Sequence, residues 1–266
     1  MAARLRPATA RLGRTLSRRR SHSTFASVDA AEVSHFDALA GDWWDAHGSS
    51  RLLHLMNPLR HDFIRSCVGD RVPDESLSYL DMGCGGGIFA ETAARLATTR
   101  HVTGMDPTPS VVAAARAHAR KDPSLSGRLE YRVGSVVEAL DMKKSFDVVT
   151  LFEVLEHVDQ PASFLEQLQP LVRPGGWLVI STMARTWTSW LTTKLAAEYV
   201  LRIVPRGTHD WSRYINDDEL RDFLLERDWE SPRVMGVAYV PGIGWRELQG
   251  GERVGNYFLG ARRQVH

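Results

Sequence analysis

The sequence lacks the features that mark several large classes of protein. Only two of its 266 residues are cysteine, too few for the disulfide framework of a small secreted domain, so a reducing compartment fits the chain. No window holds the roughly 18 uncharged apolar residues of a membrane-spanning helix. With 43% hydrophobic and 24% charged residues, the chain has the composition of a globular protein of one or two domains. Wholesale disorder, collagen-like repeats and a multi-span membrane protein are excluded.

Acidic residues are missing from the N-terminal segment. Residues 1–28 contain seven arginines and no acid, and the first carboxylate is Asp29. An Arg-rich, Ser-containing segment without acids is typical of an organellar transit peptide, whereas a secretory signal needs an apolar core of about 7–15 residues. We therefore predict that residues 1–28 are a disordered mitochondrial transit peptide and that the folded domain covers 29–266. A basic arm on a cytosolic protein is the alternative.

The rest of the chain has an excess of negative charge. Because seven of the 33 basic residues lie in the first 28 positions, 26 remain against 32 acidic residues, a net charge of −6. Binding to nucleic acid requires a basic face that neutralises phosphates. The charge balance therefore argues against nucleic acid as a partner.

Short apolar runs alternate with helical patterns after residue 75. Strands are expected at 77–82, 101–105, 129–133, 146–152, 177–181, 233–239 and 256–261, and helices at 88–96, 110–120, 162–171 and 217–226. Ser110 is the expected N-cap of the second helix. Residues 241–255, with five glycines and a proline, are expected to form a loop. The alternation predicts βαβ units and a largely parallel sheet.

A glycine-rich turn follows the first of these strands and opens a helix. The stretch DMGCGGG covers residues 81–87, and the glycines allow a tight turn and close approach of a ligand. A dinucleotide-binding motif starting at Gly83 would need glycine at position 88, where Ile88 stands. The acid at Asp81 disfavours a pyrophosphate and suits a ligand with an ammonium group. Asp106 ends the second strand, where an acid accepts hydrogen bonds from ribose hydroxyls. The pattern favours S-adenosylmethionine over NAD.

Several stretches together resemble one known family. DMGCGGG at 81–87, GMD at 104–106, FDVV at 146–149 and RPGG at 173–176 look like the class I methyltransferase fold. FDALAGDWW at 36–44, NPLR at 57–60, EVLEHV at 153–158, AEYVLRIVP at 197–205 and GTHD at 207–210 narrow the resemblance to the ubiquinone-biosynthesis O-methyltransferases of mitochondria and bacteria. The resemblance runs from about residue 31 to residue 262.

The resemblance implies a fold and an activity. The fold is a Rossmann-like α/β domain with a seven-stranded, mostly parallel sheet, a terminal antiparallel strand and helices on both faces. The activity is methyl transfer from S-adenosylmethionine to a hydroxyl of a polyprenyl dihydroxybenzene intermediate of ubiquinone synthesis. The implied cofactor contacts are Arg60, Gly83, Asp106 and Phe152, where Phe152 replaces the more common methionine or leucine, and Asp81 and Gly85 shape the pocket.

Two carboxylates and an imidazole follow the fourth expected strand. If a helical turn starts there, Glu153, Glu156 and His157 share one face. Such a set suits Mg²⁺ or Mn²⁺, with Zn²⁺ or Fe²⁺ also open, and a bound cation would acidify a phenol, whose pKa is near about 10. The structural alternative is a helix start at which glutamates complement the dipole. The resemblance to a Mg²⁺-dependent family favours the metal. Without a metal, His157 or His209 is the candidate general base.

An amphipathic insertion is expected at 187–205. Tryptophan, leucine and tyrosine recur there at helical spacing, with basic residues between them. Core packing explains such a stripe equally well. We nevertheless predict peripheral docking of this segment on the matrix side of the inner membrane, where a polyprenyl acceptor resides, and association with other ubiquinone-biosynthesis proteins.

Three other functions remain open from the sequence. One is a C-methyltransferase acting on a quinone ring, or an O-methyltransferase of a soluble phenol. The second is a non-catalytic scaffold that binds the cofactor within a biosynthetic complex. The third, a nicotinamide oxidoreductase, is weakened by Ile88.

Overall fold

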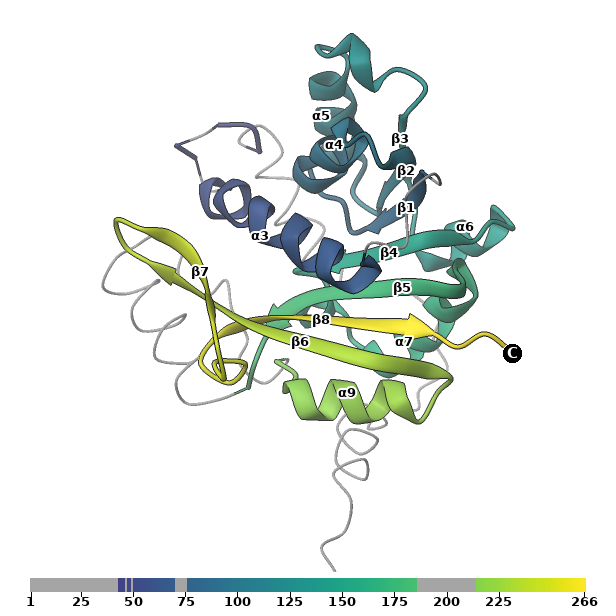
Figure 1. Cartoon of the computed structure of the whole chain (residues 1–266). Coiled ribbons are helices and arrows are strands. Elements are labelled where there is room, and N and C mark those ends of the chain that lie inside the picture. The colour runs from purple at the N-terminus through teal and green to yellow at the C-terminus, as the bar shows by residue number, and fades with distance from the viewer. Residues whose placement is uncertain (1–42, 46, 49, 70–75, 186–213) are drawn as a thin grey trace, which may run out of the picture.

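A single eight-stranded sheet organises the part of the chain that the computed structural model describes, residues 43–45, 47–48, 50–69, 76–185 and 214–266. The strand order is β3-β2-β1-β4-β5-β8-β6-β7. Pairing is parallel from β3 to β5, and β8 runs antiparallel to both β5 and β6 (Figure 1). The strands are β1 (Leu77–Met82), β2 (Thr99–Asp106), β3 (Leu129–Val133), β4 (Phe146–Phe152), β5 (Val172–Met183), β6 (Trp229–Val240), β7 (Gly244–Leu248) and β8 (Asn256–Arg263).

Helices cover both faces of the sheet. One apolar core lies under α3 (Arg51–Val68), α4 (Ile88–Arg95) and α5 (Pro109–Ala119). The other lies under α6 (Val136–Asp141), α7 (Pro161–Leu168) and α9 (Asp217–Leu225). The central strand β4 is buried along its whole length, which explains its nearly continuous apolar sequence. The two cores fix the sheet so that the carboxyl ends of β1, β2 and β4 form one edge.

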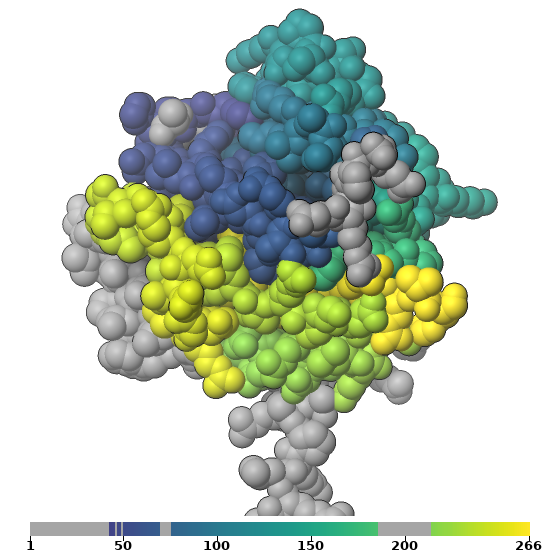
Figure 2. Space-filling view, in the orientation of Figure 1, coloured from purple at the N-terminus to yellow at the C-terminus, as the bar shows by residue number. Residues whose placement is uncertain are grey.

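Helix α3 connects the glycine-rich half of the molecule to the antiparallel half. Figure 2 shows it between α4 and the β6–β7 hairpin. On one side the Asn57 side chain donates hydrogen bonds to the Ile88 carbonyl at 3.0 Å and to the Thr92 hydroxyl at 2.9 Å. On the other side the Trp245 indole donates to the Leu52 carbonyl at 3.0 Å. Residues that α3 points toward the sheet edge are therefore held from both sides.

The α/β architecture agrees with the sequence-based expectation, but several details of that expectation were wrong. The sheet has eight strands, not seven, because residues 241–255 form a β-turn and strand β7 in place of the expected loop. Helices α3 and α6 were not anticipated. Thr108, not Ser110, occupies the N-cap position of α5. Leu77–Met82, Leu129–Val133 and Phe146–Phe152 form strands with the predicted bounds.

Three predictions concern residues outside the described ranges. These are the transit peptide at 1–28, the amphipathic insertion at 187–205, and His209 as a general base. Within the described ranges, no helix is both long and apolar enough to cross a bilayer.

Candidate functional site: a cofactor pocket at the carboxyl edge of the sheet

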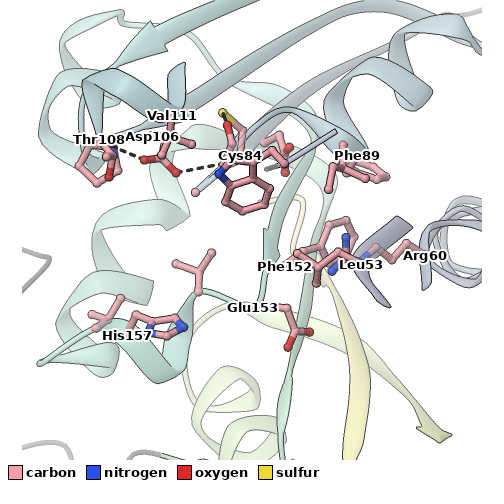
Figure 3. Close-up of a pocket in the computed structure, with 18 residues that line it drawn as sticks. Leu53, Arg60, Cys84, Phe89, Asp106, Thr108, Val111, Phe152, Glu153 and His157 are labelled. Atoms are coloured by element: carbon pink, nitrogen blue, oxygen red, sulfur yellow. Dashed lines mark hydrogen bonds between the residues drawn. The ribbon is translucent and has the colours of Figure 1, made fainter. Parts of the chain in front are cut away.

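A pocket opens where β1, β2 and β4 end, beneath the glycine turn and beside α3. It is lined by Asp81, Asp106, Phe152 and Glu153 from the strand ends, by Arg60 from α3, and by His157 from the turn after β4 (Figure 3). In open α/β sheets, ligands bind outside the carboxyl ends of the strands. The position of the pocket and its mixed apolar and charged lining therefore mark the binding site.

The glycine turn is packed too tightly for side chains. Gly83 has φ +73°, and a Cβ there would lie 2.5 Å from Val154 Cγ2. Gly85 has φ +52°, and a Cβ there would lie 2.7 Å from the Trp43 ring. Both positions require the left-handed conformation that glycine adopts without strain. The turn thus presents bare backbone to the pocket, as the sequence predicted for Gly83 and Gly85.

Asp106 ties the glycine turn to the loop before α5. Its Oδ2 accepts a hydrogen bond from the Gly85 amide at 3.0 Å, and its Oδ1 accepts one from the Thr108 amide at 2.9 Å. Burial raises the pKa of Asp106 above its ordinary value, and the two amide hydrogen bonds oppose that shift. Each carboxylate oxygen has a second lone pair. Asp106 therefore retains acceptor capacity for two vicinal hydroxyls of a ligand.

Asp81 is a buried acid at the end of β1. The Thr150 hydroxyl donates to its Oδ1 at 2.7 Å. Burial raises the pKa of Asp81 to about 6, while the Thr150 hydrogen bond and the positive charge of Arg60 act in the opposite direction. A cationic ligand group in the pocket would favour the ionised form of this acid.

Arg60 brings a positive charge into the same pocket from α3. Its side chain is buried, and its guanidinium carbon lies 4.7 Å from the centre of the Phe152 ring. Burial lowers the pKa of Arg60, and the negative charges of Glu153, Asp81 and Glu156 oppose this effect. Within the described part of the chain, the Arg60 Nε has no hydrogen-bond partner. A buried guanidinium with a spare donor is suited to an anionic ligand group such as a carboxylate.

Phe152 forms an apolar wall at the end of β4. Its ring packs edge-to-face against Phe89, with centroids 4.7 Å apart, and is almost entirely buried. The aromatic pair leaves a flat apolar surface beside Arg60. This surface fits the packing role that the resemblance implied for Phe152.

Glu153 is held in an unusual backbone conformation directly after β4. Its φ is +56°, the left-handed region that is rare for residues other than glycine. The Ser181 hydroxyl donates to Glu153 Oε1 at 2.6 Å, and the Glu153 amide donates to the Ser181 carbonyl at 3.1 Å. The end of β5 thus fixes both the backbone and the side chain of Glu153 at the pocket wall.

Glu156 is anchored differently, by the next residue of β5. The Thr182 hydroxyl donates to Glu156 Oε2 at 2.9 Å. Consecutive strand residues point to opposite faces of a sheet. Ser181 pairs with Phe258 of the α3 core and Thr182 with Tyr257 of the α9 core. The two glutamates are therefore bound by hydroxyls that belong to opposite faces.

The two glutamates still interact electrostatically. Burial is the main cause that raises the pKa of Glu156 to about 7, and the negative charge of Glu153 adds to it. The turn that carries Glu156 and His157 is a short 3-10 helix, Leu155–His157, that begins after Glu153. The expectation that Glu153, Glu156 and His157 share one face of an α-helical turn was therefore wrong.

The side chains of Glu153, Glu156 and His157 are of the types that bind a divalent cation, but their positions are not those of a metal centre. Two carboxylates and an imidazole suit a divalent cation, and the mutual repulsion of the glutamates is what a cation would relieve. Glu153 and His157 line the pocket, whereas Glu156 faces Thr182. Throughout the described ranges, no three His, Cys, Asp or Glu side chains are gathered as a metal centre requires.

The structure brings most of the predicted site residues to one pocket. Its lining includes all six proposed cofactor contacts together with Glu153 and His157. Sequence reasoning assigned no role to several other lining residues, among them Trp43, Thr108 and Val111. Thr108 and Val111 lie just after Asp106 in the chain, so a search of the positions that follow the second strand would have found them.

Comparisons with known proteins agree with this geometry. A family model described as a methyltransferase domain matches residues 27–231. The chain is 46% identical over 255 residues to the mitochondrial ubiquinone biosynthesis O-methyltransferase of Schizosaccharomyces pombe, covering 94% of this chain and 90% of that protein. It is 36% identical to the protein of the same name from Saccharomyces cerevisiae, covering 92% of this chain and 90% of that protein.

Solved structures share the fold at low sequence identity. A plantazolicin methyltransferase in complex with SAH and a monoazolic desmethylPZN analogue superposes with a TM-score of 0.61 at 17% identity, covering 88% of this chain and 97% of that one. Magnesium protoporphyrin IX methyltransferase from Synechocystis, with bound SAM, gives 0.60 at 15% identity, covering 91% and 100%. Taken with the glycine turn and its acids, these matches show that the chain is an S-adenosylmethionine-dependent methyltransferase and belongs to the ubiquinone biosynthesis O-methyltransferase family.

Proposed function

We propose that this protein transfers the methyl group of S-adenosylmethionine to a phenolic hydroxyl of a polyprenyl dihydroxybenzene intermediate of ubiquinone synthesis. The observation that carries the proposal is that one pocket contains both halves of the required chemistry. The glycine turn and Asp106 form one wall, and Glu153 and His157 lie on another. A methyl donor and a phenol bound there would be close enough to react directly.

The cofactor half of the pocket offers opposite charges to the two charged groups of the amino acid moiety. Asp81 would pair with the ammonium group, and Arg60 would donate to the carboxylate through the nitrogen that has no partner. Asp106 would accept hydrogen bonds from the ribose hydroxyls, and Phe152 would pack against the adenosine. These contacts would hold the cofactor in one orientation for transfer of its methyl group.

The acceptor half of the pocket would prepare the phenol. During transfer, the phenolic oxygen forms a bond to the methyl carbon, the carbon–sulfur bond breaks, and the phenol loses its proton. If no cation is bound, His157 at the pocket wall would accept that proton. Glu153 and His157, joined by Glu156 once its side chain turns from Thr182 toward the pocket, are the residues that would hold a divalent cation. A cation held there would act as a Lewis acid and lower the pKa of a catechol hydroxyl.

Methyl transfer to a short-chain polyprenyl catechol tests the proposal. The purified protein is assayed with S-adenosylmethionine, with and without EDTA, and after Mg²⁺ is restored, and the product is analysed by mass spectrometry. We expect an O-methyl product, loss of activity in EDTA and recovery with Mg²⁺. A ring C-methyl product would overturn the substrate assignment. Full activity in EDTA would overturn the metal role and leave His157 as the base.

Glu153→Gln provides a matched variant for the same assay. It keeps the size and the contact with Ser181 but removes the negative charge, so we expect activity to fall at least tenfold and the Mg²⁺ requirement to rise. Glu166→Gln, an exposed position on α7, serves as the control. A Glu153→Gln variant with wild-type activity at low Mg²⁺ would contradict the assignment.

The location we propose is the matrix side of the mitochondrial inner membrane. The curated relatives from two yeasts are named as mitochondrial proteins, and a polyprenyl acceptor resides in the bilayer. Residues 187–205 would dock on the surface, and other proteins of the pathway would join the enzyme in a complex. Co-sedimentation with liposomes of wild type against the Trp187/Trp190/Leu191→Ser variant tests the docking. Equal sedimentation of the two proteins would end the idea.

A further inference from the structure

Trp43 lies directly against the glycine turn. Its ring atoms approach the backbone of Gly85 and Gly86 so closely that a Cβ at either glycine would lie under 3.0 Å from the indole. The ring also packs with Ile88 and Val111, and it forms part of the pocket wall. Trp43 is thus placed beside the turn, where it can contact a ligand in the pocket.

The Trp43 indole carries a donor that the protein leaves unused. Trp43 is 9% exposed, and among the residues that the structure describes its Nε1 has no hydrogen-bond partner. A buried donor without an acceptor is costly, and proteins rarely retain one without a reason. The pocket that Trp43 lines is where S-adenosylmethionine binds, and that cofactor carries oxygen and nitrogen acceptors along its whole length.

The neighbouring residue, Trp44, is fixed by an independent set of contacts. Its Nε1 donates to the Gly86 carbonyl at 2.9 Å. Its ring stacks on the His118 imidazole, with centroids 3.5 Å apart and planes 4° apart. His118 Nδ1 is in turn hydrogen-bonded to Glu91 Oε1 at 2.8 Å, and Glu91 is fully buried. These contacts hold the backbone that precedes Trp44 against the glycine turn.

A second contact fixes the backbone of Trp43 itself. His54 of α3 donates from Nε2 to the Trp43 carbonyl at 2.8 Å. Trp43 is therefore held by α3 on one side and, through Trp44 and His118, by α5 on the other. So many fixed contacts around one unsatisfied donor indicate a preformed binding position.

We propose that Trp43 is a cofactor-binding residue whose indole N–H donates to bound S-adenosylmethionine, and that His118 is a positioning residue that holds Trp43 in place through Trp44. The inference concerns only the cofactor, so it stands or falls independently of the acceptor, the metal and the membrane. Trp43→Phe removes the donor and keeps an aromatic ring on the turn. Trp43→Ala removes both.

Calorimetric titration with S-adenosylhomocysteine tests the role of Trp43. We expect Trp43→Phe to bind about tenfold more weakly than wild type, as the loss of one hydrogen bond implies, and Trp43→Ala to bind more weakly still. Trp177→Phe changes another buried tryptophan outside the pocket and should stay within about twofold of wild type. Unchanged or tighter binding by Trp43→Phe would overturn the proposal, since tighter binding would mean that the indole occupies the cofactor's place.

Fluorescence gives a second readout of cofactor binding, independent of calorimetry. Quenching of tryptophan emission by S-adenosylhomocysteine should be reduced in Trp43→Phe and retained in Trp177→Phe.

Steady-state kinetics test the role of His118. His118→Phe keeps a flat ring for Trp44, whereas His118→Ala does not. We expect the KM for S-adenosylmethionine to rise several-fold in His118→Ala with kcat changed less than twofold, and to be largely rescued in His118→Phe. Equal KM values in wild type and His118→Ala would refute the positioning role.

Discussion

Asp106 performs two tasks with one carboxylate, because it holds two backbone amides and faces the pocket. Asp106→Asn removes the charge and one of the two acceptor oxygens. Hydrogen bonds to charged groups contribute about 1.5–3 kcal/mol each. We therefore expect the affinity for S-adenosylhomocysteine, measured by calorimetry, to fall by about 10- to 100-fold. Asp141→Asn, on the exposed surface of α6, is the control and should bind as wild type does.

Asp81 gives the cofactor affinity a pH dependence of known sign. Burial raises its pKa to about 6 in the free protein, and a bound ammonium group would lower that pKa. Binding therefore favours the ionised acid and releases a proton near pH 6. The affinity for S-adenosylhomocysteine should increase from pH 5 to about pH 6 and level off by pH 7. Calorimetry in buffers of different ionisation enthalpy measures the released proton. A flat profile in wild type, or the same profile in Asp81→Asn, would contradict this role.

The raised pKa values of Asp81 and Glu156 also affect the free energy of unfolding, which should decrease as the pH rises, whereas the cofactor affinity should increase. Asp81 and Glu156 have folded-state pKa values of about 6 and about 7, above their ordinary values of 3.8 and 4.5. An acid whose pKa is raised by folding contributes stability below its unfolded pKa, and that contribution is lost as the pH rises through the folded pKa. These two groups should therefore lower the free energy of unfolding between about pH 4 and pH 7 in the absence of ligand.

At the scale of elements, the end of β5 governs the acidic wall of the pocket. Thr182→Val would leave Glu156 buried without its hydroxyl donor. We expect the free energy of unfolding to fall by about 1–3 kcal/mol at pH 8, where the carboxylate is charged. The loss should be smaller at pH 5, because the acid is then neutral. Denaturant titrations at both pH values measure the difference, and Thr182→Ser, which keeps the hydroxyl, should behave as wild type. An equal loss at both pH values would mean that packing, not the hydrogen bond, is responsible.

Helix α3 shows why one element of the site was not predicted from the sequence. Its buried positions follow a helical spacing, but two of them are the polar residues Asn57 and Arg60. Pro58 lies between them, in the helix interior, where proline usually breaks a helix. The buried polar residues are there because one ties α3 to α4 and the other faces the pocket. Because polar residues occupy two of the buried positions, the sequence lacks the regular apolar spacing from which a helix is predicted.

Strand β7 was missed for the opposite reason. Its flanking segments are rich in glycine, which favours loops when judged locally. The strand forms because it pairs with β6 over Gly236–Val240. A prediction from the local sequence pattern takes no account of that pairing. In contrast, Phe146–Phe152 was predicted with the correct bounds because a fully buried parallel strand leaves a continuous apolar run.

At the scale of the whole molecule, ligand binding should stabilise the fold by mass action. At a concentration of S-adenosylhomocysteine 100 times its Kd, the gain is about 2.7 kcal/mol. For a domain of this size that corresponds to an increase in Tm of roughly 5–10 °C. Thermal unfolding should show this shift with S-adenosylhomocysteine and none with NAD. A shift with NAD alone would mean that the glycine turn binds a dinucleotide.

The acid pair illustrates the limit of sequence reasoning for a site. Glu153 and His157 line the pocket, whereas Glu156, which the sequence grouped with them, does not. The sequence did not reveal the left-handed backbone at Glu153, nor that adjacent hydroxyls of β5 bind the two glutamates. Such details depend on the register between β4 and β5, which no local pattern contains.

The position of β8 has a consequence for how the protein is made. β8 follows β6 and β7 in the sequence, yet it lies between β5 and β6, and in the described sheet β6 and β7 are joined to the other strands only through it. A growing polypeptide therefore cannot close its sheet until residues 256–263 have been synthesised. Until then the apolar edge of β5 and the loose β6–β7 hairpin are exposed to aggregation. Completion of the sheet therefore depends on residues 256–263, even if the cofactor-binding half folds earlier during synthesis.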